Sequence, residues 1–345
     1  MSSTNISFKP KQITKKITSH LQDRARDVIM NRFGLTGEDV ERKTLEEIGK
    51  KYNITRERVR QIEESAINLI KKSDAYKAEQ AVFEELKNLI HSLGGVVAEH
   101  ELLPHVSKDQ LTQNHIHFYL VLGDAFKKHR EDDHFKTRWS VDDETATKVH
   151  DSLKKLYSTL KDEDLVPETE MIQKFFEQMK DTAENYKNEE IAKRWLSISK
   201  TISKNPLGEW GKSNSQNIHT RGVKDYAFLV MRRHGSPMHF REVTDAISKT
   251  FNRKTHYATT HNELIKDPRF VLIGRGLYAL AEWGYKTGIA RDVIKDILKI
   301  EGPMSKEDVV EKVMKERYFK KNTILVNLAN TKYFKKNKNG LYTLA

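Results

Sequence analysis

The chain contains no cysteine in its 345 residues. This absence excludes disulfides, thiolate metal sites such as zinc fingers, and a cysteine nucleophile. No apolar run approaches the ~20 residues that cross a bilayer as a helix, and the first twenty residues lack the hydrophobic centre of a signal peptide. We therefore expect a cytoplasmic protein that does not bind membranes.

Motifs of enzyme chemistry are also missing. The sequence has no P-loop, no Gly-rich dinucleotide turn and no clustered Asp/Glu/Lys signature. The densest group of possible metal ligands follows no recognised spacing and lies in a hydrophilic stretch, where we expect a solvated loop: His115, His117, His129, Asp132, Asp133 and His134. We predict no catalytic residue, no metal and no cofactor, and we expect that the protein is not an enzyme.

Charge is abundant, and it is biased toward the positive sign. The chain has 61 Lys and Arg against 49 Asp and Glu, which gives a formal net charge of +12, and 37% of its residues are hydrophobic. A basic surface suits a polyanionic partner. The length allows two to three ordinary domains or several small ones, so we expect small domains and a partner such as DNA.

Residues Thr44 to Ile70, TLEEIGKKYNITRERVRQIEESAINLI, predict two helices joined by a tight turn. Thr44 and Glu47 have the spacing of a capping box that begins the first helix. Thr55 is placed to cap the second helix, while Ile54 and Val59 have the spacing of a hydrophobic staple. This pattern is typical of a helix-turn-helix.

The second helix has two faces of different chemistry. At about 100° per residue, an apolar side is predicted to pack inward: Val59, Ile62, Ala66 and Leu69. The opposite side carries Arg56, Glu57, Arg60 and Gln61, residue types that bond guanine, cytosine and adenine in the major groove. Arg58 and Lys50 or Lys51 flank them as candidate phosphate contacts. The alternative is a solvated helix face, on which Glu57 only favours the positive end of the helix and Glu63 or Glu64 pairs with neighbouring basic side chains.

Residues 24–72, with ARDVIMNRFGL and then TLEEIGKKYNITRERVRQIE, resemble region 4 of the bacterial primary sigma-factor family. In that family this module reads the upstream promoter hexamer and docks on the flap of RNA polymerase core. The resemblance implies that Arg56, Glu57, Arg60 and Gln61 read bases, and that Thr44 and Leu45 contact the DNA backbone. With Thr55 and Arg58, these residues form the candidate DNA-binding set of the module.

The chain also departs from that family. In sigma factors region 4 closes the chain and follows an aromatic-rich segment that melts the promoter, whereas here a Ser/Thr/Lys-bearing segment precedes it and other domains follow. We therefore expect a regulator that uses the reading module without complete initiation-factor activity. Core polymerase with this protein alone is not expected to start transcription.

We divide the chain into small domains by apolar periodicity and by Gly-, Pro- and Ser-rich breaks. Residues 1–20 are predicted to be a flexible basic tail, followed by the sigma-like module over 21–72. Residues 76–142 and 143–212 read as helical units and as candidates for diverged winged helices; a charged hairpin over Phe126 to Val141 would close the first. Residues 205–222 form either an extended wing around Trp210 or a linker, which we place at 213–222.

The C-terminal third contains an internal repeat. RFVLIGRGLYALA at 269–281 matches YFKKNKNGLYTLA at 333–345, and Pro237-Met238 matches Pro303-Met304. Each copy, 223–284 and 285–345, reads as three helices and a two-stranded hairpin, which is a winged helix. The first copy, with GSPMHFREV and GRGLYALAEWG, resembles the HARE-type helix-turn-helix, found in chromatin regulators, restriction systems and the delta subunit of some RNA polymerases.

The two hairpins differ in charge. Lys335, Lys336 and Lys338 on the second predict phosphate contacts, whereas the first offers Arg269 and Arg275 among apolar residues and suits protein as well as DNA. His261 in the first copy aligns with Leu325 in the second, so we interpret it as a half-buried packing residue.

Together these features predict a mainly α fold of tandem small helix-turn-helix and winged-helix domains with short β-hairpin wings. The function they favour is a sequence-specific, sigma-like transcription factor that binds double-stranded DNA and contacts RNA polymerase core. The alternatives are a protein-interaction scaffold of the transcription machinery, and a DNA-binding component of a restriction or nuclease system.

Overall fold

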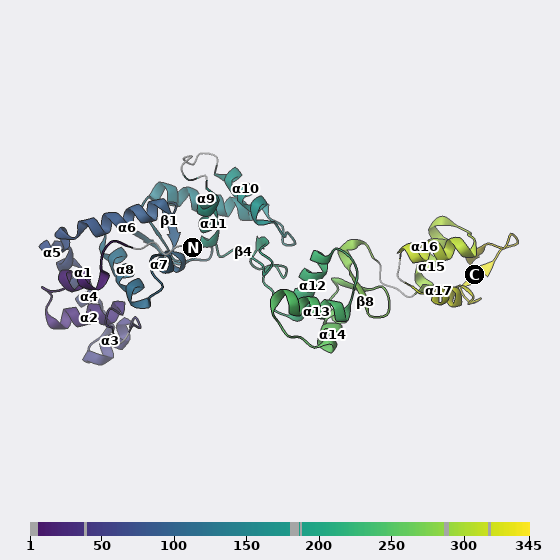
Figure 1. Cartoon of the computed structure of the whole chain (residues 1–345), viewed down its shortest axis with the longest axis horizontal. Coiled ribbons are helices and arrows are strands. Elements are labelled where there is room, and N and C mark those ends of the chain that lie inside the picture. The colour runs from purple at the N-terminus through teal and green to yellow at the C-terminus, as the bar shows by residue number, and fades with distance from the viewer. Residues whose placement is uncertain (1–5, 38–39, 180–185, 187, 286–289, 317–318) are drawn as a thin grey trace. The chain divides into compact units, whose positions relative to one another are not determined.

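The computed structural model describes residues 6–37, 40–179, 186, 188–285, 290–316 and 319–345. The chain forms two compact units, an N-terminal unit that ends at Asn214 and a C-terminal unit that continues to Ala345, with residues 205–207 assigned to the latter. The described elements are mainly helices with short antiparallel hairpins (Figure 1). This confirms the predicted fold class. No helix in these ranges is both long enough and apolar enough to cross a bilayer.

The N-terminal module begins the first unit with five helices: α1 (Pro10–Ile17), α2 (Asp23–Phe33), α3 (Leu45–Tyr52), α4 (Arg56–Lys72) and α5 (Asp74–Ala78). In this module α2 ends at Phe33, directly before Gly34, and α4 ends at Lys72.

The first helix differs from the flexible tail that we expected over residues 1–20, of which residues 1–5 lie outside the described ranges. α1 begins at Pro10, and its Ile13 and Ile17 are buried. The polar composition of this segment hid the spacing of Ile13 and Ile17, which lie one turn apart and form one apolar face. Residues 10–17 are therefore part of the folded unit.

The first winged helix follows with α6 (Gln80–Ser92), β1 (Val96–Ala98), α7 (Glu99–Val106), α8 (Gln110–Leu122), β2 (Lys127–His129) and β3 (Arg138–Ser140). Its antiparallel sheet has the order β1-β3-β2, with Trp139 of β3 opposite Val97 and Lys128. The hairpin predicted over Phe126 to Val141 is thus the wing of this domain.

The second winged helix comprises α9 (Asp143–Thr159), α10 (Glu168–Gln178), α11 (Glu189–Ile198), β4 (Ile202–Lys204) and β5 (Trp210–Lys212). An isolated bridge from Val166 to Trp210 takes the place of its first strand. Of the two interpretations of the Trp210 segment, the wing is right for residues 202–212, because β4 pairs with β5 and Trp210 is buried in the core.

The C-terminal unit repeats this topology twice. The third winged helix consists of α12 (Val223–His234), β6 (Met238–His239), α13 (Phe240–Phe251), α14 (Tyr257–Lys266), β7 (Phe270–Leu272), β8 (Leu277–Leu280) and the 3-10 turn η2 (Ala281–Trp283). The fourth consists of α15 (Ala290–Glu301), α16 (Lys306–Glu316), α17 (Lys321–Leu328), β9 (Phe334–Lys336) and β10 (Tyr342–Leu344), with a bridge from Met304 to Tyr342. The repeat inferred from the sequence therefore corresponds to two structural copies.

The N-terminal module and the first winged helix share one hydrophobic core. α8 lies beside α1 and α2 in the N-terminal unit (Figure 1), and its residues 114–120 are all buried. Phe118 packs on Phe33 of α2 with 4.9 Å between ring centroids, and Tyr119 packs on Phe83 of α6. α8 therefore belongs to both domains, and neither domain closes its core without it.

Polar bonds fix the same interface. Asn114, fully buried on α8, donates to the carbonyl oxygens of Gly34 (2.9 Å) and Val40 (2.7 Å) and accepts from Arg42 Nε (2.8 Å). At the other end of the interface, the Thr14 hydroxyl lies 2.8 Å from both His115 Nδ1 and the Tyr119 hydroxyl. Buried polar groups need such partners, so these bonds also set how the two domains are oriented.

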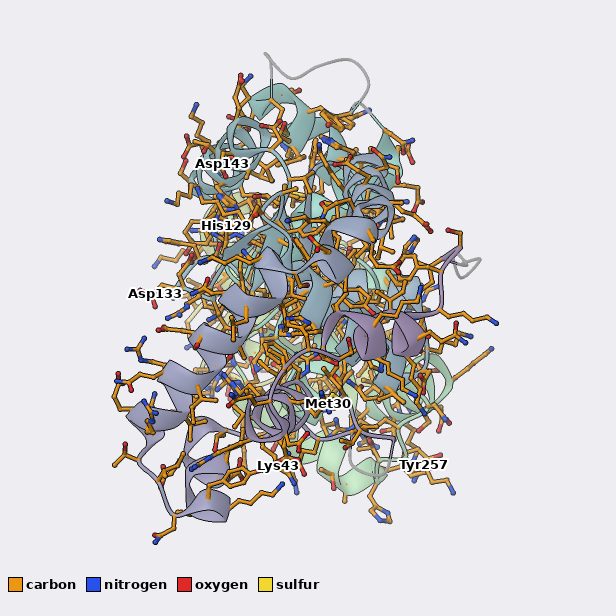
Figure 2. The ribbon with its side chains drawn as sticks, turned by 90° about the vertical axis from the view of Figure 1, so that its left-hand side faces the viewer. Met30, Lys43, His129, Asp133, Asp143 and Tyr257 are labelled. Carbon is orange, nitrogen blue, oxygen red and sulfur yellow. The ribbon has the colours of Figure 1, made fainter. Side chains whose placement is uncertain are left out.

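The histidines considered as metal ligands divide into two groups. His115 and His117 lie in buried α8, contrary to the solvated loop that we expected, and burial lowers their pKa values to about 4 and about 3. His129 lies 2.9 Å from Ser140 Oγ, and Asp133 points to solvent (Figure 2). Within the ranges that the structure describes, no three His, Asp or Glu residues are arranged to hold a metal ion.

Replacing Asn114 by Ala tests the interface between the two domains. We expect Asn114→Ala to lower the unfolding free energy of the N-terminal unit by about 1–3 kcal/mol, because two carbonyls and one guanidinium N–H lose a buried partner. Urea unfolding followed by tryptophan fluorescence measures this. Asn88→Ala, at an exposed position of α6, is the matched control, and an equal effect of the two substitutions would contradict the role assigned to Asn114.

Candidate nucleic-acid interface

The turn between α3 and α4 has the geometry of a helix-turn-helix. Asn53 ends α3 in the left-handed conformation (φ 52°), and the Ile54 amide donates to the Gly49 carbonyl (3.0 Å). A Cβ on Gly49 would lie 2.7 Å from the Ile54 carbonyl oxygen. This contact leaves no room for a side chain, so glycine at position 49 sets how closely the turn approaches α3.

Both helices begin with the caps that the sequence predicted. Thr44 and Glu47 form a capping box, in which the Thr44 amide donates to Glu47 Oε2 (2.7 Å) and the Glu47 amide donates to Thr44 Oγ1 (3.2 Å). Thr55 accepts from the Arg58 amide at 3.1 Å. These bonds satisfy amides that a helix start leaves free and fix where α4 begins.

A small core holds the two helices on α2. Val28, Ile48 and Val59 are fully buried there, with Leu45 and Ile54 packed against them. Along α4 the buried positions are Val59, Ala66 and Ile70, while Ile62 is partly buried. The prediction that Leu69 packs inward is wrong, since 52% of it is exposed and Ile70 takes its place. The inward face turns toward Ile70 because α5 and α8 cover that side.

The opposite face of α4 is open. Arg56, Glu57, Arg60 and Gln61 are all exposed on its first two turns. Arg60 bonds Glu57 (2.7 Å) and also Glu64, and the hydrogen bond from Arg60 lowers the pKa of Glu57. The solvated-face alternative predicted the pairing of Glu64 but not the pairing of Glu57. The pairs are exposed and therefore weak, so they leave the side chains able to exchange partners.

The flanking lysines are engaged within the module. Lys51 lies 2.7 Å from Asp27 Oδ2, which also accepts from the Tyr52 hydroxyl, and Lys50 lies 3.2 Å from Glu46. Arg58 donates to Gln61 Oε1 (3.1 Å). All of these groups lie beside the start of α4, where a phosphate backbone would compete for them.

In the fourth winged helix, the predicted lysines lie on the wing. Lys335 and Lys336 are exposed on β9, opposite Thr343 and Tyr342, and Lys338 is exposed in the turn. Successive strand residues point to opposite faces, so Lys335 and Lys336 project from the two sides of the hairpin. Lys336 also lies over the Tyr342 ring, 5.1 Å from its centroid.

The first hairpin of the repeat is different. Arg269 bonds Asp225 and Asp267, each at 2.8 Å, in a half-buried cluster, and only Arg275 of the two arginines is exposed. His261 stacks on Phe240 with 4.5 Å between centroids, which fits its interpretation as a packing residue.

Sequence reasoning missed the role of α8. In a winged helix the third helix normally meets DNA, but α8 is buried between its own domain and the N-terminal module. Its sequence carried a usable signal, because seven residues from Ile116 to Leu122 include six apolar side chains, and a helix that is apolar all round is a buried one.

Comparisons with known proteins identify two of these modules. Residues 19–72 match the family model "Sigma-70, region 4", and residues 221–283 match the HARE-HTH family model, a helix-turn-helix domain named after ASXL and restriction endonuclease proteins among others. The chain is 51% identical over 57 residues to the RNA polymerase sigma factor RpoD of Helicobacter pylori and 47% identical over 57 residues to the sigma factor SigA of Nostoc sp..

These relatives match within one module. Each match covers 16% of this chain, and they span only 8% of the Helicobacter pylori protein and 14% of the Nostoc protein. No solved structure matches the chain. Both resemblances seen in the sequence are thus confirmed, and they associate the chain with DNA binding and transcription.

Replacing Gly49 by Ala tests the helix-turn-helix geometry. The new Cβ collides with the Ile54 carbonyl, so we expect Gly49→Ala to destabilise the module by about 1–3 kcal/mol and to weaken binding to DNA. Thermal unfolding and a DNA titration measure the two effects. Gly37→Ala is the control, because a Cβ there comes no closer than 3.9 Å to Lys11 Nζ; equal losses in both variants would contradict the argument.

Proposed function

We propose that this protein is a sequence-specific transcription factor that reads a short promoter-type element in double-stranded DNA with α4 and contacts RNA polymerase core. The observation that carries the proposal is the open face of α4, which presents Arg56, Glu57, Arg60 and Gln61 from a capped, rigidly held helix start. The match of residues 19–72 to sigma-70 region 4 supports it. The proposed function is binding, without a chemical step.

The chemistry of reading follows from these side chains. A guanidinium bonds guanine O6 and N7 together, a glutamine amide bonds adenine, and a carboxylate accepts from cytosine N4. In free protein Arg60 is held by Glu57 and Glu64. Binding exchanges these exposed ion pairs for base contacts, so Glu57 also holds Arg60 in position before DNA arrives.

The fourth winged helix extends the footprint in this proposal. Lys335, Lys336 and Lys338 project from a narrow hairpin whose sequence, residues 334–344, contains no Asp or Glu. Contacts with phosphates carry no sequence information of their own. The wing therefore adds affinity, and α4 supplies the preference for particular bases.

The surface of the third winged helix favours a protein partner. The alternative of a protein-interaction scaffold therefore still applies to that domain. The domain exposes Tyr257 and Ile265 on α14 and Leu272 on β7, with exposed fractions of 46%, 62% and 50%. We take these side chains as the candidate surface for a protein partner. This domain is a second contact point, and DNA reading does not depend on it.

Arg60→Ala tests base reading. We expect affinity for the preferred site to fall about 10- to 100-fold and preference to relax at one base position, because one bidentate contact is lost. Competition binding with single-base variants of the site measures both effects. An equal loss on preferred and scrambled DNA would show that Arg60 contacts only the backbone.

Replacing both Lys335 and Lys336 by Ala tests the wing. We expect preferred and scrambled DNA to lose affinity alike, with the slope of log affinity against log salt falling by about 0.9 for each phosphate contact removed. Titrations at several salt concentrations measure this slope, and Lys299→Ala, at an exposed position of α15, serves as the control. A change in base preference in the double lysine variant would show that base reading has been assigned to the wrong domain.

Competition with a primary sigma factor tests the contact with polymerase. We expect full-length protein to co-purify with core enzyme and to be displaced by added primary sigma factor, because both would use a region 4 module on one surface. Deletion of residues 1–72 is unsuitable as a test, since it would remove the N-terminal side of the core in which α8 is buried. Failure to co-purify, or retention in the presence of excess sigma factor, would remove polymerase from the proposal.

A further inference from the structure

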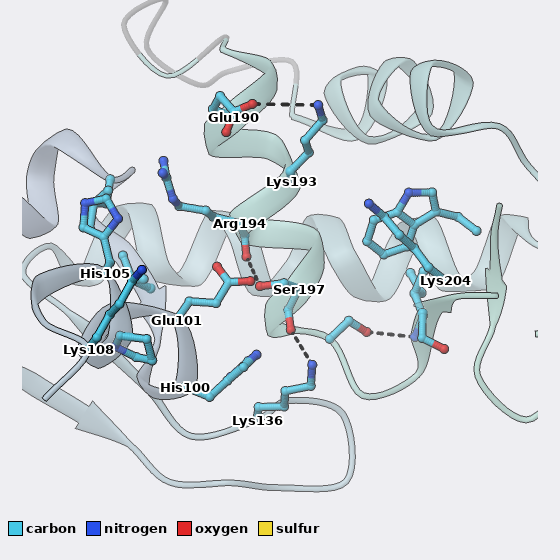
Figure 3. A pocket seen from close by; sticks show the side chains of 17 residues that line it. His100, Glu101, His105, Lys108, Lys136, Glu190, Lys193, Arg194, Ser197 and Lys204 are labelled. Carbon is cyan, nitrogen blue, oxygen red and sulfur yellow. Dashed lines mark hydrogen bonds and ion pairs between the residues drawn. The ribbon is translucent and has the colours of Figure 1, made fainter. Parts of the chain in front are cut away.

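A cavity of about 740 Å³ lies between the first and second winged helices, within the N-terminal unit. One wall is α7, the other is the outer side of α11, and β4 with Trp210 closes the end (Figure 3). Its volume is in the range of cavities that hold small molecules.

The two walls are fixed to each other. Trp195 Nε1 of α11 donates to the Gly94 carbonyl (3.1 Å), the Lys136 amide donates to the Ile198 carbonyl (2.9 Å), and the Lys200 amide donates to the His134 carbonyl (2.8 Å). A Cβ on Gly94 would lie 2.7 Å from Ile191, so glycine permits this close approach. The cavity is a built feature of the unit, formed where the two domains meet.

Apolar and charged groups are separated in the cavity. Its deep part consists of buried Leu93, Val97, Ile202 and Trp210. Cationic side chains line the rest: Lys108, Lys136, Lys193, Arg194 and Lys204, against the carboxylates Glu101 and Glu190. A ligand that fits this cavity has an apolar part and a negatively charged group.

Ion pairs neutralise the cationic side chains at one end of the cavity and leave the other end positively charged. Glu168 binds both Lys193 (3.2 Å) and Lys204, and Glu190 adds a second carboxylate beside Lys193. At the other end of the cavity (Figure 3), Arg194 of α11 is partly buried and Lys108 is exposed at the rim, and neither forms an ion pair in the part of the chain that the structure describes. A partly buried cation without an anion is costly, so Arg194 is poised for one.

Other groups around Arg194 add hydrogen bonds without removing this charge. Lys136 Nζ donates to the Ser197 carbonyl (2.9 Å) and points along the cavity (Figure 3). Burial lowers the pKa of His100 and of His105, with Lys136 and Arg194 acting in the same direction. Both shifts favour the neutral imidazole.

The shape argues against duplex DNA at this place. The face of α11 that lines the cavity is the one that a winged helix presents to DNA, but here α7 stands across from it with the carboxylate of Glu101 (Figure 3). A duplex needs an open surface, whereas a small molecule enters between two walls.

We propose that this cavity binds a small organic phosphate, in which an apolar ring lies on the Leu93, Ile202 and Trp210 floor and the phosphate groups meet Arg194, Lys108 and Lys136. A nucleoside diphosphate has this chemistry. Because the cavity joins two domains of the unit that carries α4, its occupant stabilises their packing and provides a regulatory input that is separate from DNA reading.

Calorimetric titration of the full chain with ADP, GDP and UDP tests the proposal. We expect saturable binding of one nucleotide per chain, with adenosine and pyrophosphate each much weaker, because one lacks the charge and the other the apolar body. Arg194→Gln should weaken nucleotide binding about tenfold or more, as a charge-assisted bond is lost. Glu101→Gln should strengthen it severalfold, since repulsion of the phosphate is removed.

Two controls keep the outcome interpretable. Arg130→Gln removes an arginine outside the cavity, and Arg60→Ala removes one from α4; neither should change nucleotide affinity, and circular dichroism checks that each variant is folded. Binding by none of the three nucleotides at millimolar concentration overturns the proposal. Unchanged nucleotide binding in Arg194→Gln would also overturn it. A loss of duplex DNA affinity in that variant, without a loss of nucleotide affinity, would do the same.

Discussion

The burial of α8 on all sides is the constraint on which the N-terminal unit depends. Its side chains complete the core of the first winged helix and also close the core formed by α1, α2 and α4. Large side chains such as Phe118 and Tyr119 each contribute about 1.5–3 kcal/mol when fully buried. Asn114 adds hydrogen bonds, which are directional, whereas hydrophobic burial has no preferred direction. The result is one compact unit with a shared core, on which the start of α4 is exposed.

Four copies of one topology differ in what they can contact. The third helix of the first copy, α8, is buried in the interface with the N-terminal module. The third helix of the second copy, α11, lines a cavity. The third copy exposes Tyr257 and Ile265, and the fourth carries lysines on its wing. A winged helix supplies a scaffold, and the side chains on its outer face decide the partner.

Local signals made much of this predictable. The capping box at Thr44, the cap at Thr55 and the repeated hairpins depend on neighbours in sequence, and each was found where the residues indicated. Leu69 and α1 were misjudged for different reasons: which face of α4 is buried depends on distant helices, and in α1 the polar composition outweighed the spacing of Ile13 and Ile17. The cavity was invisible because Arg194, Lys108 and Trp210 come together only when the two domains pack.

The central claim is that α4 selects particular base pairs, and selection of bound duplexes from a random DNA pool by the full chain tests it most directly. We expect enrichment of one short motif, of the length that a single major-groove helix can read, and loss of that motif when Arg56, Arg60 and Gln61 are replaced together. Enrichment of no motif, or survival of the same motif in the triple variant, would contradict it.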